Sequence, residues 1–201
     1  MKRIIAVSGY KGRLGSELVK RGCIPLDCDI THINSIKKAI DEVCPDIIIH
    51  CAALTDVDEC ERHKDKAFEI NAAGTYNIKE CYPDNRIIYI STDYIFDGTN
   101  GVYCERDGAS PVTKLCYYGY TKLLGEEIMT GADTIVRTTL LYGSPVKMDF
   151  VTSILENLEC GEVFGVTKAL HGTPTYIPHL AEAIMMLPLY SPMPHIINIV
   201  A

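Results

Sequence analysis

The sequence predicts an α/β fold built on a doubly wound parallel sheet. Short apolar runs of strand length alternate with segments of helical periodicity along most of the chain, and this alternation is typical of βαβ units. Some runs are apolar at every position, as strands buried between two helical layers are. Of the 201 residues, 47% are hydrophobic and 22% are charged, so the chain can form the core of one medium-sized domain.

The first half of the chain predicts strands and helices in alternation. Thr31 is expected to cap a helix, because threonine oxygens accept hydrogen bonds from the free N–H groups of a first turn, and Pro45 lies just beyond the end of that helix. The expected elements are a strand at 4–7, a helix through 14–19, a short strand at 23–26, a helix at 33–43, a strand at 47–49 and a long helical stretch over about 57–81.

The second half predicts three more strands and three more helices. Gly131 and Gly161 follow two of these helices, as glycine often does at a helix end, and Pro178 suits a first helical position. The expected elements are a strand at 87–90, a loop rich in Asp, Gly and Pro at 93–113, a helix at 115–130, a strand at 134–137, helices at 149–160 and 178–187, and a final strand at 195–200.

Composition argues against several classes of protein. The net charge of −7 argues against a nucleic-acid partner, which needs a basic face, and no apolar run reaches the length of a membrane span or a signal-peptide core. Nine scattered cysteines without a Cys-x-x-Cys pair suit reduced thiols in the cytoplasm. Cys60 and His63 share one helical face but have no second ligand pair nearby, so no metal is expected.

The first motif with chemical content is Gly9-Tyr10-Lys11-Gly12-Arg13-Leu14-Gly15, between the first strand and the first helix. Glycines there let a pyrophosphate approach the backbone at a helix N-terminus, where free N–H groups favour anions. The spacing is Gly-x-x-Gly-x-x-Gly rather than Gly-x-Gly-x-x-Gly, so the strand–turn–helix context carries the prediction. The alternative is a tight turn that binds nothing.

The second motif is Tyr118-Gly119-Tyr120-Thr121-Lys122. Tyr118 and Lys122 are four residues apart, so on a helix both project from the same face. A phenol needs a neighbouring cation to act in acid–base chemistry near neutral pH, and Lys122 supplies one. Neither Tyr117 nor Tyr120 has a lysine four residues on. The alternative is an ordinary exposed helix pair.

The third motif is the run from Ser91 to Gly98, which begins where the fourth strand ends. Ligands of open parallel sheets bind at the carboxyl ends of the strands, so the hydroxyl of Thr92 is placed to meet a substrate carbonyl. The alternative is a Ser-Thr-Asp turn that only leads the chain out of the strand.

With these three motifs in this order, the chain resembles the extended short-chain dehydrogenase/reductase family and, within it, the dTDP-4-dehydrorhamnose reductase group. The run Ser-Thr-Asp-Tyr-x-Phe-Asp-Gly is the most group-specific part of the resemblance. The matching segments are Ser8 to Gly15, Pro45 to Asp58, Asn71 to Thr75, Ser91 to Gly98, Tyr118 to Glu126, Arg137 to Gly143 and Gly172 to Tyr176.

The resemblance implies a Rossmann-type dinucleotide-binding domain at 1–143 and a small, abridged substrate lobe at 144–201, packed on the same domain and partly returning to the sheet. It implies that NADP(H) or NAD(H) reduces the C4 carbonyl of a nucleotide-linked 4-keto-6-deoxy sugar. Tyr118 would donate the proton, Lys122 would be its electrostatic partner and a ribose ligand, and Thr92 would hydrogen-bond the carbonyl.

The implied cofactor residues include Asn71, which would support the active-site hydrogen bonds. The full set is Gly9, Lys11, Gly12, Arg13, Leu14, Gly15, Asp29, Ile30, Ala52, Ala53, Thr55, Asn71, Tyr118 and Lys122. Lys11 and Arg13 suit a 2′-phosphate, while Asp27 or Asp29 suits a free 2′-hydroxyl, so the sequence leaves NADPH and NADH open. It also leaves a homodimer open.

Three departures weaken the implied sugar site. Leu140 stands where the reductases usually have Trp, Ala169-Leu170 replaces an Asp-Gln pair, and the chain ends at Ala201 where family members usually continue. Two alternatives therefore remain: a dinucleotide-binding regulatory subunit resembling the beta subunit of methionine adenosyltransferase, and a nucleotide-sugar epimerase or dehydratase.

Overall fold

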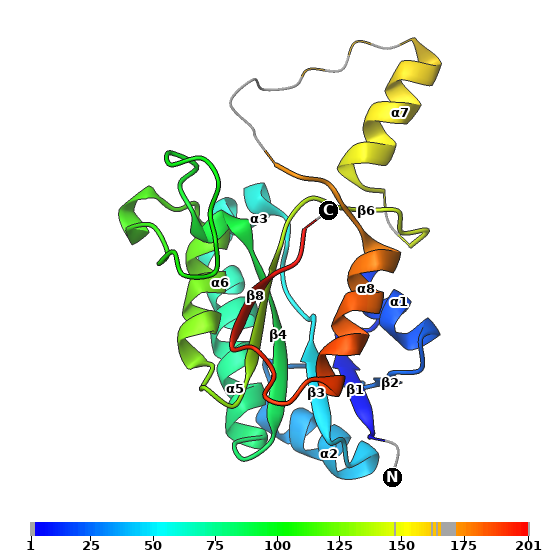
Figure 1. The fold of residues 1–201 in the computed structure, drawn as a ribbon, viewed down its shortest axis with the longest axis vertical. Helices are drawn as coiled ribbons and strands as arrows, with labels where there is room; N and C mark the ends of the chain where they lie inside the picture. Colours follow the sequence, from blue (N-terminus) through cyan, green and yellow to red (C-terminus); the bar gives the residue numbers. More distant parts are fainter. Residues whose placement is uncertain (1–2, 147, 162, 164, 166–171, 201) are drawn as a thin grey trace.

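The predicted doubly wound parallel sheet is present in the computed structural model, which describes residues 3–146, 148–161, 163, 165 and 172–200. Within these ranges a six-stranded sheet has the order β2-β1-β3-β4-β5-β8 (Figure 1), and neighbouring strands are parallel throughout. The strands are β1 (Ile5–Ser8), β2 (Ile24–Pro25), β3 (Ile47–His50), β4 (Arg86–Thr92), β5 (Thr134–Thr138) and β8 (Ile196–Asn198). Strand β2 lies on one side of β1, and the next strand in sequence, β3, lies on the other side. Open parallel sheets bind ligands at this point, where the direction of strand addition reverses.

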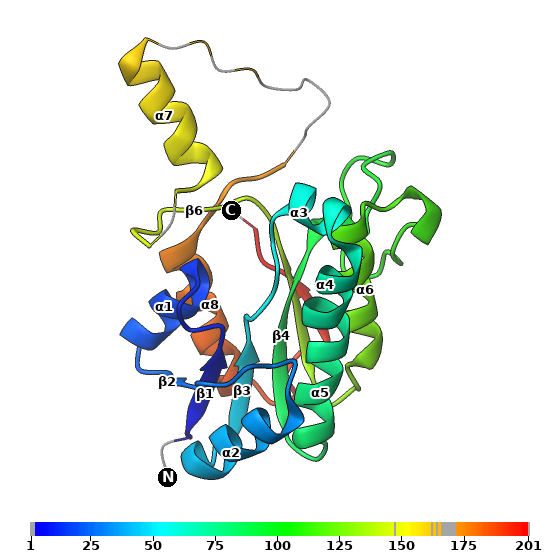
Figure 2. The same ribbon diagram turned by 180° about the vertical axis from the view of Figure 1, so that it is seen from behind.

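Helices cover both faces of the sheet (Figures 1 and 2). One face packs against α1 (Arg13–Lys20) and α8 (Ile177–Met186). The other packs against α2 (Ile33–Val43), α5 (Gly74–Cys81) and α6 (Tyr117–Ile128).

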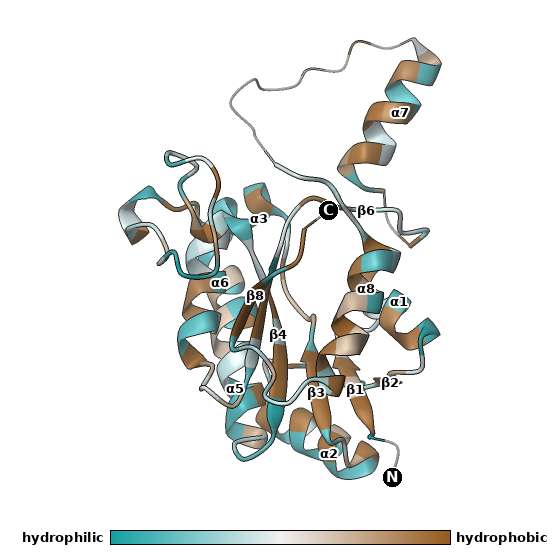
Figure 3. Cartoon of the chain, in the orientation of Figure 1, coloured by the Kyte–Doolittle hydropathy of each residue, from teal (hydrophilic) through white to brown (hydrophobic). Residues whose placement is uncertain are grey.

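The strand sequences explain why both faces are covered. Successive side chains of a strand point to opposite faces, so an unbroken apolar run fills both layers, and Figure 3 shows the strands as the most apolar part of the fold. The α1/α8 layer receives Val7, Ile49, Ile88 and Val136. The α2/α5 layer receives Ala6, Ile48, Ile87 and Ile135.

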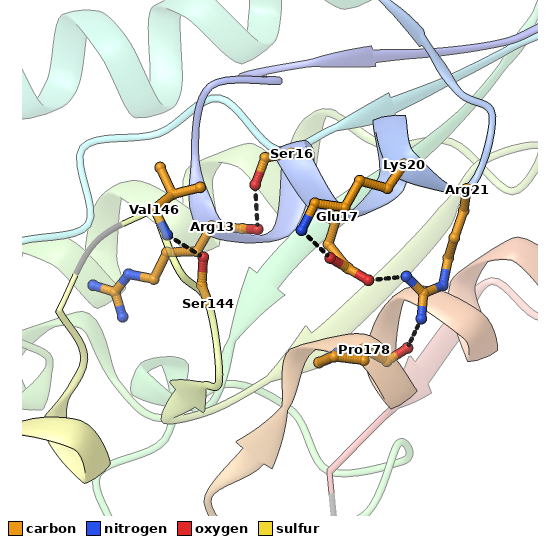
Figure 4. A network of polar contacts seen from close by, with 8 residues as sticks. All are labelled: Arg13, Ser16, Glu17, Lys20, Arg21, Ser144, Val146 and Pro178. Carbon is orange, nitrogen blue, oxygen red and sulfur yellow. Dashed lines mark hydrogen bonds and ion pairs between the residues drawn. The ribbon is translucent and has the colours of Figure 1, made fainter.

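The first layer is also joined by polar contacts. Arg21 at the end of α1 forms an ion pair with Glu17, and its Nη2 donates to the backbone oxygen of Pro178 at 3.0 Å (Figure 4). Lys20 pairs with the same glutamate at 3.1 Å. These contacts hold α1, which follows the glycine motif, against α8.

The expected cap at Thr31 is wrong. Helix α2 begins after His32, without a side-chain cap. The N–H and hydroxyl of Thr31 both donate to Asp29 Oδ1, at 2.9 and 2.7 Å, so the threonine closes an Asx turn and its hydroxyl proton is already used.

The stretch expected as one helix over 57–81 is divided. It consists of α3 (Val57–Arg62), α4 (Lys64–Phe68), a π-helical turn (Glu69–Ala73) and α5. π-turns are frequent at functional sites, and this one contains the fully buried Asn71.

The described residues after Leu140 follow the prediction in outline. Helix α7 (Phe150–Cys160) is capped by Asp149 and ends at Gly161 with φ +70°, and it stands away from the sheet in both ribbon views (Figures 1 and 2). Two short strands that were not predicted, β6 (Leu141–Tyr142) and β7 (Thr175–Tyr176), pair in parallel. Helix α8 begins one residue before Pro178, and β8 is shorter than expected.

Of these elements, β8 joins the main sheet beside β5 and α8 packs against it, while the division of the chain at residue 143 stays a prediction. Ala169 and Leu170 lie outside the described residues. No helix in the described ranges is long and apolar enough to cross a bilayer.

Candidate active site

A cavity of about 550 Å³ lies at the carboxyl ends of the central strands and brings the three predicted motifs together. Of the predicted site residues, Gly9, Lys11, Gly12, Arg13, Leu14, Gly15, Ala53, Thr55, Thr92, Tyr118 and Lys122 line it. The cavity is also lined by Ser91, Asp93 and Tyr94 of the third motif, and by residues that the sequence analysis did not single out, namely Cys51, Val57, Thr138, Thr139, Leu141 and Val146. Several of these directly follow β3, β4 or β5, so their position after a strand is the signal that could have found them.

The glycine turn fits closely against the backbone around it. Gly9 has φ +68°, and a Cβ there would lie 2.6 Å from the backbone nitrogen of Ala52. A Cβ at Gly15 would lie 2.3 Å from the backbone oxygen of Gly9. Side chains are therefore excluded at both positions, and α1 begins after Gly12 with no side-chain cap. This leaves the helix N-terminus free for a phosphate.

A second cavity of about 440 Å³ adjoins the ends of β1 and β2. It is lined by the predicted residues Asp29, Ile30 and Ala52, and it shares Gly9 and Lys11 with the first cavity. Two cavities that meet at a glycine turn match the shape of a dinucleotide, which has two nucleotides joined through a pyrophosphate. The residues present therefore fit such a cofactor.

The acidic side chains beside the second cavity differ in their availability. The Asp29 carboxylate is engaged by Thr31 and lies 3.3 Å from His32 Nδ1. Asp27 Oδ1 lies 4.0 Å from Lys11 Nζ, and both of these side chains are more than 70% exposed. Asp27 and Lys11 are thus exposed charged groups at the edge of this cavity.

Tyr118 lies at the start of α6, close to Thr92. A Cβ at Gly119 would lie 2.1 Å from the backbone oxygen of Tyr94, so the glycine allows the helix to approach the turn that follows β4. Tyr118 is 9% exposed, and its ring meets that of Tyr94 edge to face at 5.8 Å. Burial raises the pKa of the Tyr118 phenol, while a hydrogen bond with Thr92 acts in the opposite direction.

Lys122 follows one turn later on α6 and is 3% exposed. Its Nζ lies 4.1 Å from the centroid of the Tyr89 ring, a favourable cation–π distance. Burial lowers the pKa of Lys122 to about 7, although the neighbouring Cys51 and Glu126 act to raise it. Strongly lowered lysine pKa values are concentrated at functional sites.

A buried polar cluster, Ser91–Glu126–Arg137, supports these residues from the α6 side. The Ser91 hydroxyl donates to Glu126 Oε1 at 2.5 Å, and Arg137 Nη2 donates to Glu126 Oε2 at 2.8 Å. Ser91 immediately precedes Thr92, and Glu126 lies one turn beyond Lys122. The cluster therefore fixes α6 against the ends of β4 and β5.

Asn71 differs from the other predicted residues because it lies behind the cavity wall. Its Oδ1 accepts from Leu54 N at 2.7 Å, and its Nδ2 donates to Leu54 O and to Thr121 Oγ1, both at 3.0 Å. Thr121 donates in turn to the backbone oxygen of Tyr118 at 2.8 Å. Asn71 thus connects the segment after β3 to the helix that carries Tyr118.

A second set of buried hydrogen bonds reaches Asn71 from β1. Burial, with the nearby positive charge of Lys122, lowers the pKa of His50 to about 3, so its ring is neutral and carries one N–H. Thr75 donates to the backbone oxygen of Asn71 at 2.6 Å and so accepts from His50 Nε2, at 3.1 Å. His50 Nδ1 then accepts from the Ser8 hydroxyl at 2.6 Å.

Comparison with known proteins gives a family match that covers most of the chain. Residues 1–191 match the family model described as the RmlD substrate binding domain. The chain is 34% identical over 198 residues to the spore coat polysaccharide biosynthesis protein SpsK of Bacillus subtilis, covering 91% of this chain and 69% of that protein. It is also 34% identical over 197 residues to dTDP-4-keto-6-deoxy-D-glucose reductase of Streptomyces niveus, covering 90% and 67%.

Solved structures agree with these relatives. The crystal structure of dTDP-4-dehydrorhamnose reductase of Bacillus anthracis in complex with NADP has a TM-score of 0.90 and 32% identity, and the match covers all of this chain and 75% of that one.

A further relative is methionine adenosyltransferase 2 subunit beta of Danio rerio, 31% identical over 203 residues, with 90% of this chain and 62% of that protein covered.

Proposed function

Because the chain belongs to the RmlD substrate binding domain family, we propose that it is an NAD(P)H-dependent reductase of a nucleotide-linked 4-keto-6-deoxy sugar. The observation that carries this proposal is that Thr92, Tyr118 and Lys122 line one cavity with the glycine turn. Relatives named dTDP-4-keto-6-deoxy-D-glucose reductase and dTDP-4-dehydrorhamnose reductase support the substrate class.

When bound, the dihydronicotinamide supplies the hydride that reduces the carbonyl carbon. The chain's own residues deliver the proton. Tyr118 donates its phenolic proton to the carbonyl oxygen, and Thr92, whose hydroxyl now bonds Asp93 Oδ1 at 3.2 Å, turns to donate to the same oxygen. Hydride and proton together convert the ketone to an alcohol.

Lys122 keeps the proton donor effective. Burial alone stabilises the neutral phenol of Tyr118 and so opposes the negative charge that develops as the proton leaves. An ammonium one helical turn away offsets this cost, and its remaining N–H groups can bond ribose hydroxyls. The glycine turn and the start of α1 hold the pyrophosphate.

The two alternatives keep the dinucleotide but change the chemistry. The methionine adenosyltransferase relative suggests a regulatory subunit. Such a subunit has no need for the hydroxyls of Thr92 and Tyr118 and the amine of Lys122, which all line the cavity. An epimerase or dehydratase would retain its cofactor through the cycle, whereas a reductase must exchange it. The reductase is favoured because Thr92, Tyr118 and Lys122 are all present in one cavity, and because several relatives and the structure with a TM-score of 0.90 carry that name.

The cofactor is NADPH or NADH, since relatives of known structure were solved with NADP and, at lower identity, with NAD. The homodimer and the cytoplasmic location stay predictions from the sequence, as do the roles of the individual cofactor residues.

The test is oxidation of NADH or NADPH by purified protein in the presence of dTDP-4-dehydrorhamnose or dTDP-4-keto-6-deoxy-D-glucose. Tyr118→Phe should lower kcat by about 10²- to 10⁴-fold, which is the usual contribution of a positioned acid. Tyr117→Phe is the matched control, since Tyr117 precedes it on the same helix but does not line the cavity. Turnover that survives unchanged in Tyr118→Phe would exclude the proposed proton donor.

A further inference from the structure

The hydroxyl of Thr138 has no hydrogen-bond partner within the described part of the chain, although its oxygen is buried. Two other buried atoms share this property there, Lys79 Nζ and Asn198 Oδ1. Lys79 Nζ lies 2.9 Å from Asp133 Oδ2 and is paired electrostatically, and Asn198 lies on the edge strand β8, away from both cavities. Thr138 alone of the three lines the 550 Å³ cavity.

Thr138 occupies a defined place in the cavity wall. It is the last residue of β5, and its Cα pairs with that of Thr92 on β4. Side chains at paired positions of adjacent strands point to the same face, and the strands lie about 4.8 Å apart. The Thr138 side chain, 4% exposed, therefore stands one strand away from the hydroxyl assigned to the substrate carbonyl.

The neighbouring threonines already have partners. Thr92 Oγ1 accepts from Tyr94 N at 3.2 Å and donates to Asp93. The hydroxyl of Thr139 also bonds the Asp93 carboxylate. A buried polar group without a partner is rare in folded proteins and calls for an explanation. A ligand group in the cavity provides one for Thr138.

We propose that the Thr138 hydroxyl hydrogen-bonds the carboxamide of the nicotinamide ring, and so fixes which face of the ring meets the substrate. The proposal rests on the proposed function, because it assumes a dinucleotide. In the strand order β2-β1-β3-β4-β5, the second cavity lies at β2 and the glycine turn at β1. A dinucleotide that started there and continued across the sheet would bring its nicotinamide to β4 and β5.

The carboxamide is the chemical group that this position suits. It is the one hydrogen-bonding substituent of the ring, and a hydroxyl can both donate to its oxygen and accept from its nitrogen. In the proposed function the sugar carbonyl already accepts hydrogen bonds from Thr92 and Tyr118. Thr138 is thereby a positioning residue for the cofactor, separate from the proton donor.

The experiment compares the dissociation constants of NADH and ADP-ribose, measured by calorimetry without sugar. ADP-ribose lacks the nicotinamide ring, so Thr138→Val should weaken NADH about tenfold, or ~1.4 kcal/mol, and leave ADP-ribose unchanged. Thr138→Ser, which keeps the hydroxyl, should restore NADH binding. Stereospecifically deuterated NADH should also show reduced facial selectivity of transfer in Thr138→Val.

Thr134→Val is the matched control. Thr134 lies on the same strand and the same face, is fully buried, and donates to the backbone oxygen of Pro194 at 2.7 Å. The substitution Thr134→Val therefore removes a buried threonine hydroxyl that lies outside both cavities, so this variant should bind NADH and ADP-ribose as the wild type does.

Three results would overturn the assignment: unchanged NADH affinity in Thr138→Val, an equal loss of NADH and ADP-ribose affinity, or a rise in KM for the sugar alone. In each of these the wild type still binds NADH, and the proposed function stands. A wild type that binds neither NADH nor ADP-ribose would overturn both proposals.

Discussion

The buried ammonium of Lys122 predicts that activity falls as the pH rises above about 7. Burial lowers the pKa of this lysine to about 7, because water that would stabilise the charge is excluded. The titratable groups near it in the described structure include Cys51 after β3, His50 on β3, Tyr89 on β4, and Tyr118 and Glu126 on its own helix. Since the proposed role requires the positive charge, activity should follow the protonated fraction.

The size of the effect follows from that pKa. At a pKa of about 7, roughly nine tenths of the lysines are protonated at pH 6, one tenth at pH 8 and one hundredth at pH 9. The ratio kcat/KM reports groups of the free enzyme. It should therefore fall about tenfold from pH 6 to pH 8 and about tenfold again by pH 9.

Unfolding linked to Lys122 cannot imitate this loss. The folded-state pKa lies below the ordinary lysine value of 10.5, so between about pH 7 and 10.5 the unfolded chain binds more protons. Stability contributed by this lysine therefore rises with pH in that window, while activity falls. The two trends have opposite signs and can be separated by recording Tm at each pH.

The assay is kcat/KM for NADH at saturating sugar between pH 6 and 9, for the wild type and two variants. Lys122→Arg keeps its charge over the whole range. Its kcat/KM should be lower than that of the wild type but should not decrease as the pH rises. Lys122→Met should be weak at every pH. A flat wild-type profile, or the same fall in Lys122→Arg, would refute the assigned role of the ammonium.

Three further predictions test other parts of the structure. Glu126→Gln leaves the buried Arg137 without its counter-charge, which costs about 3–5 kcal/mol, so Tm should fall by roughly 6–20 °C; an unchanged Tm would show that the pair is not stabilising. Gly15→Ala places a Cβ 2.3 Å from the backbone oxygen of the first glycine of the turn, so the fraction of this variant that folds should bind no NADH in a titration. Wild-type affinity in this variant would show that the turn does not exclude a side chain. Lys11→Ala should weaken NADPH more than NADH and Asp27→Ala the reverse, measured as the ratio of dissociation constants; equal losses would remove both residues from cofactor selection.

Local sequence patterns predicted most of the fold for a physical reason. Strands buried on both faces, such as β3, are apolar at each of several successive positions, and α7 has an Asp cap and a terminal Gly that act within one turn. The errors arose where two local options compete. Thr31 can cap a helix or close a turn, and the choice depends on the carboxylate of Asp29, whose position the pattern does not specify.

The active site was predictable to the extent that its residues directly follow strands or share a helix face. Tyr118, Lys122 and Thr92 were found in this way. Thr138 was not, because the sequence gives no sign that its hydroxyl lacks a partner. That property depends on what β4 and β8 place around it, and it appears only when the sheet is assembled.

The hydrogen bonds behind the cavity explain why such supporting residues escape sequence analysis. The bond from Ser8 to His50 spans 42 residues of sequence, the bond from His50 to Thr75 spans 25, and the bond from Asn71 to Thr121 spans 50. Periodicity relates residues a few positions apart, so it cannot relate these. Yet the bonds form a continuous path from the strand before the glycine turn to the helix that carries the proton donor. Their geometry depends on the π-helical turn that places Asn71 in the core. The residues that position the active site from behind therefore depend on contacts distant in sequence, and these leave no periodic signal.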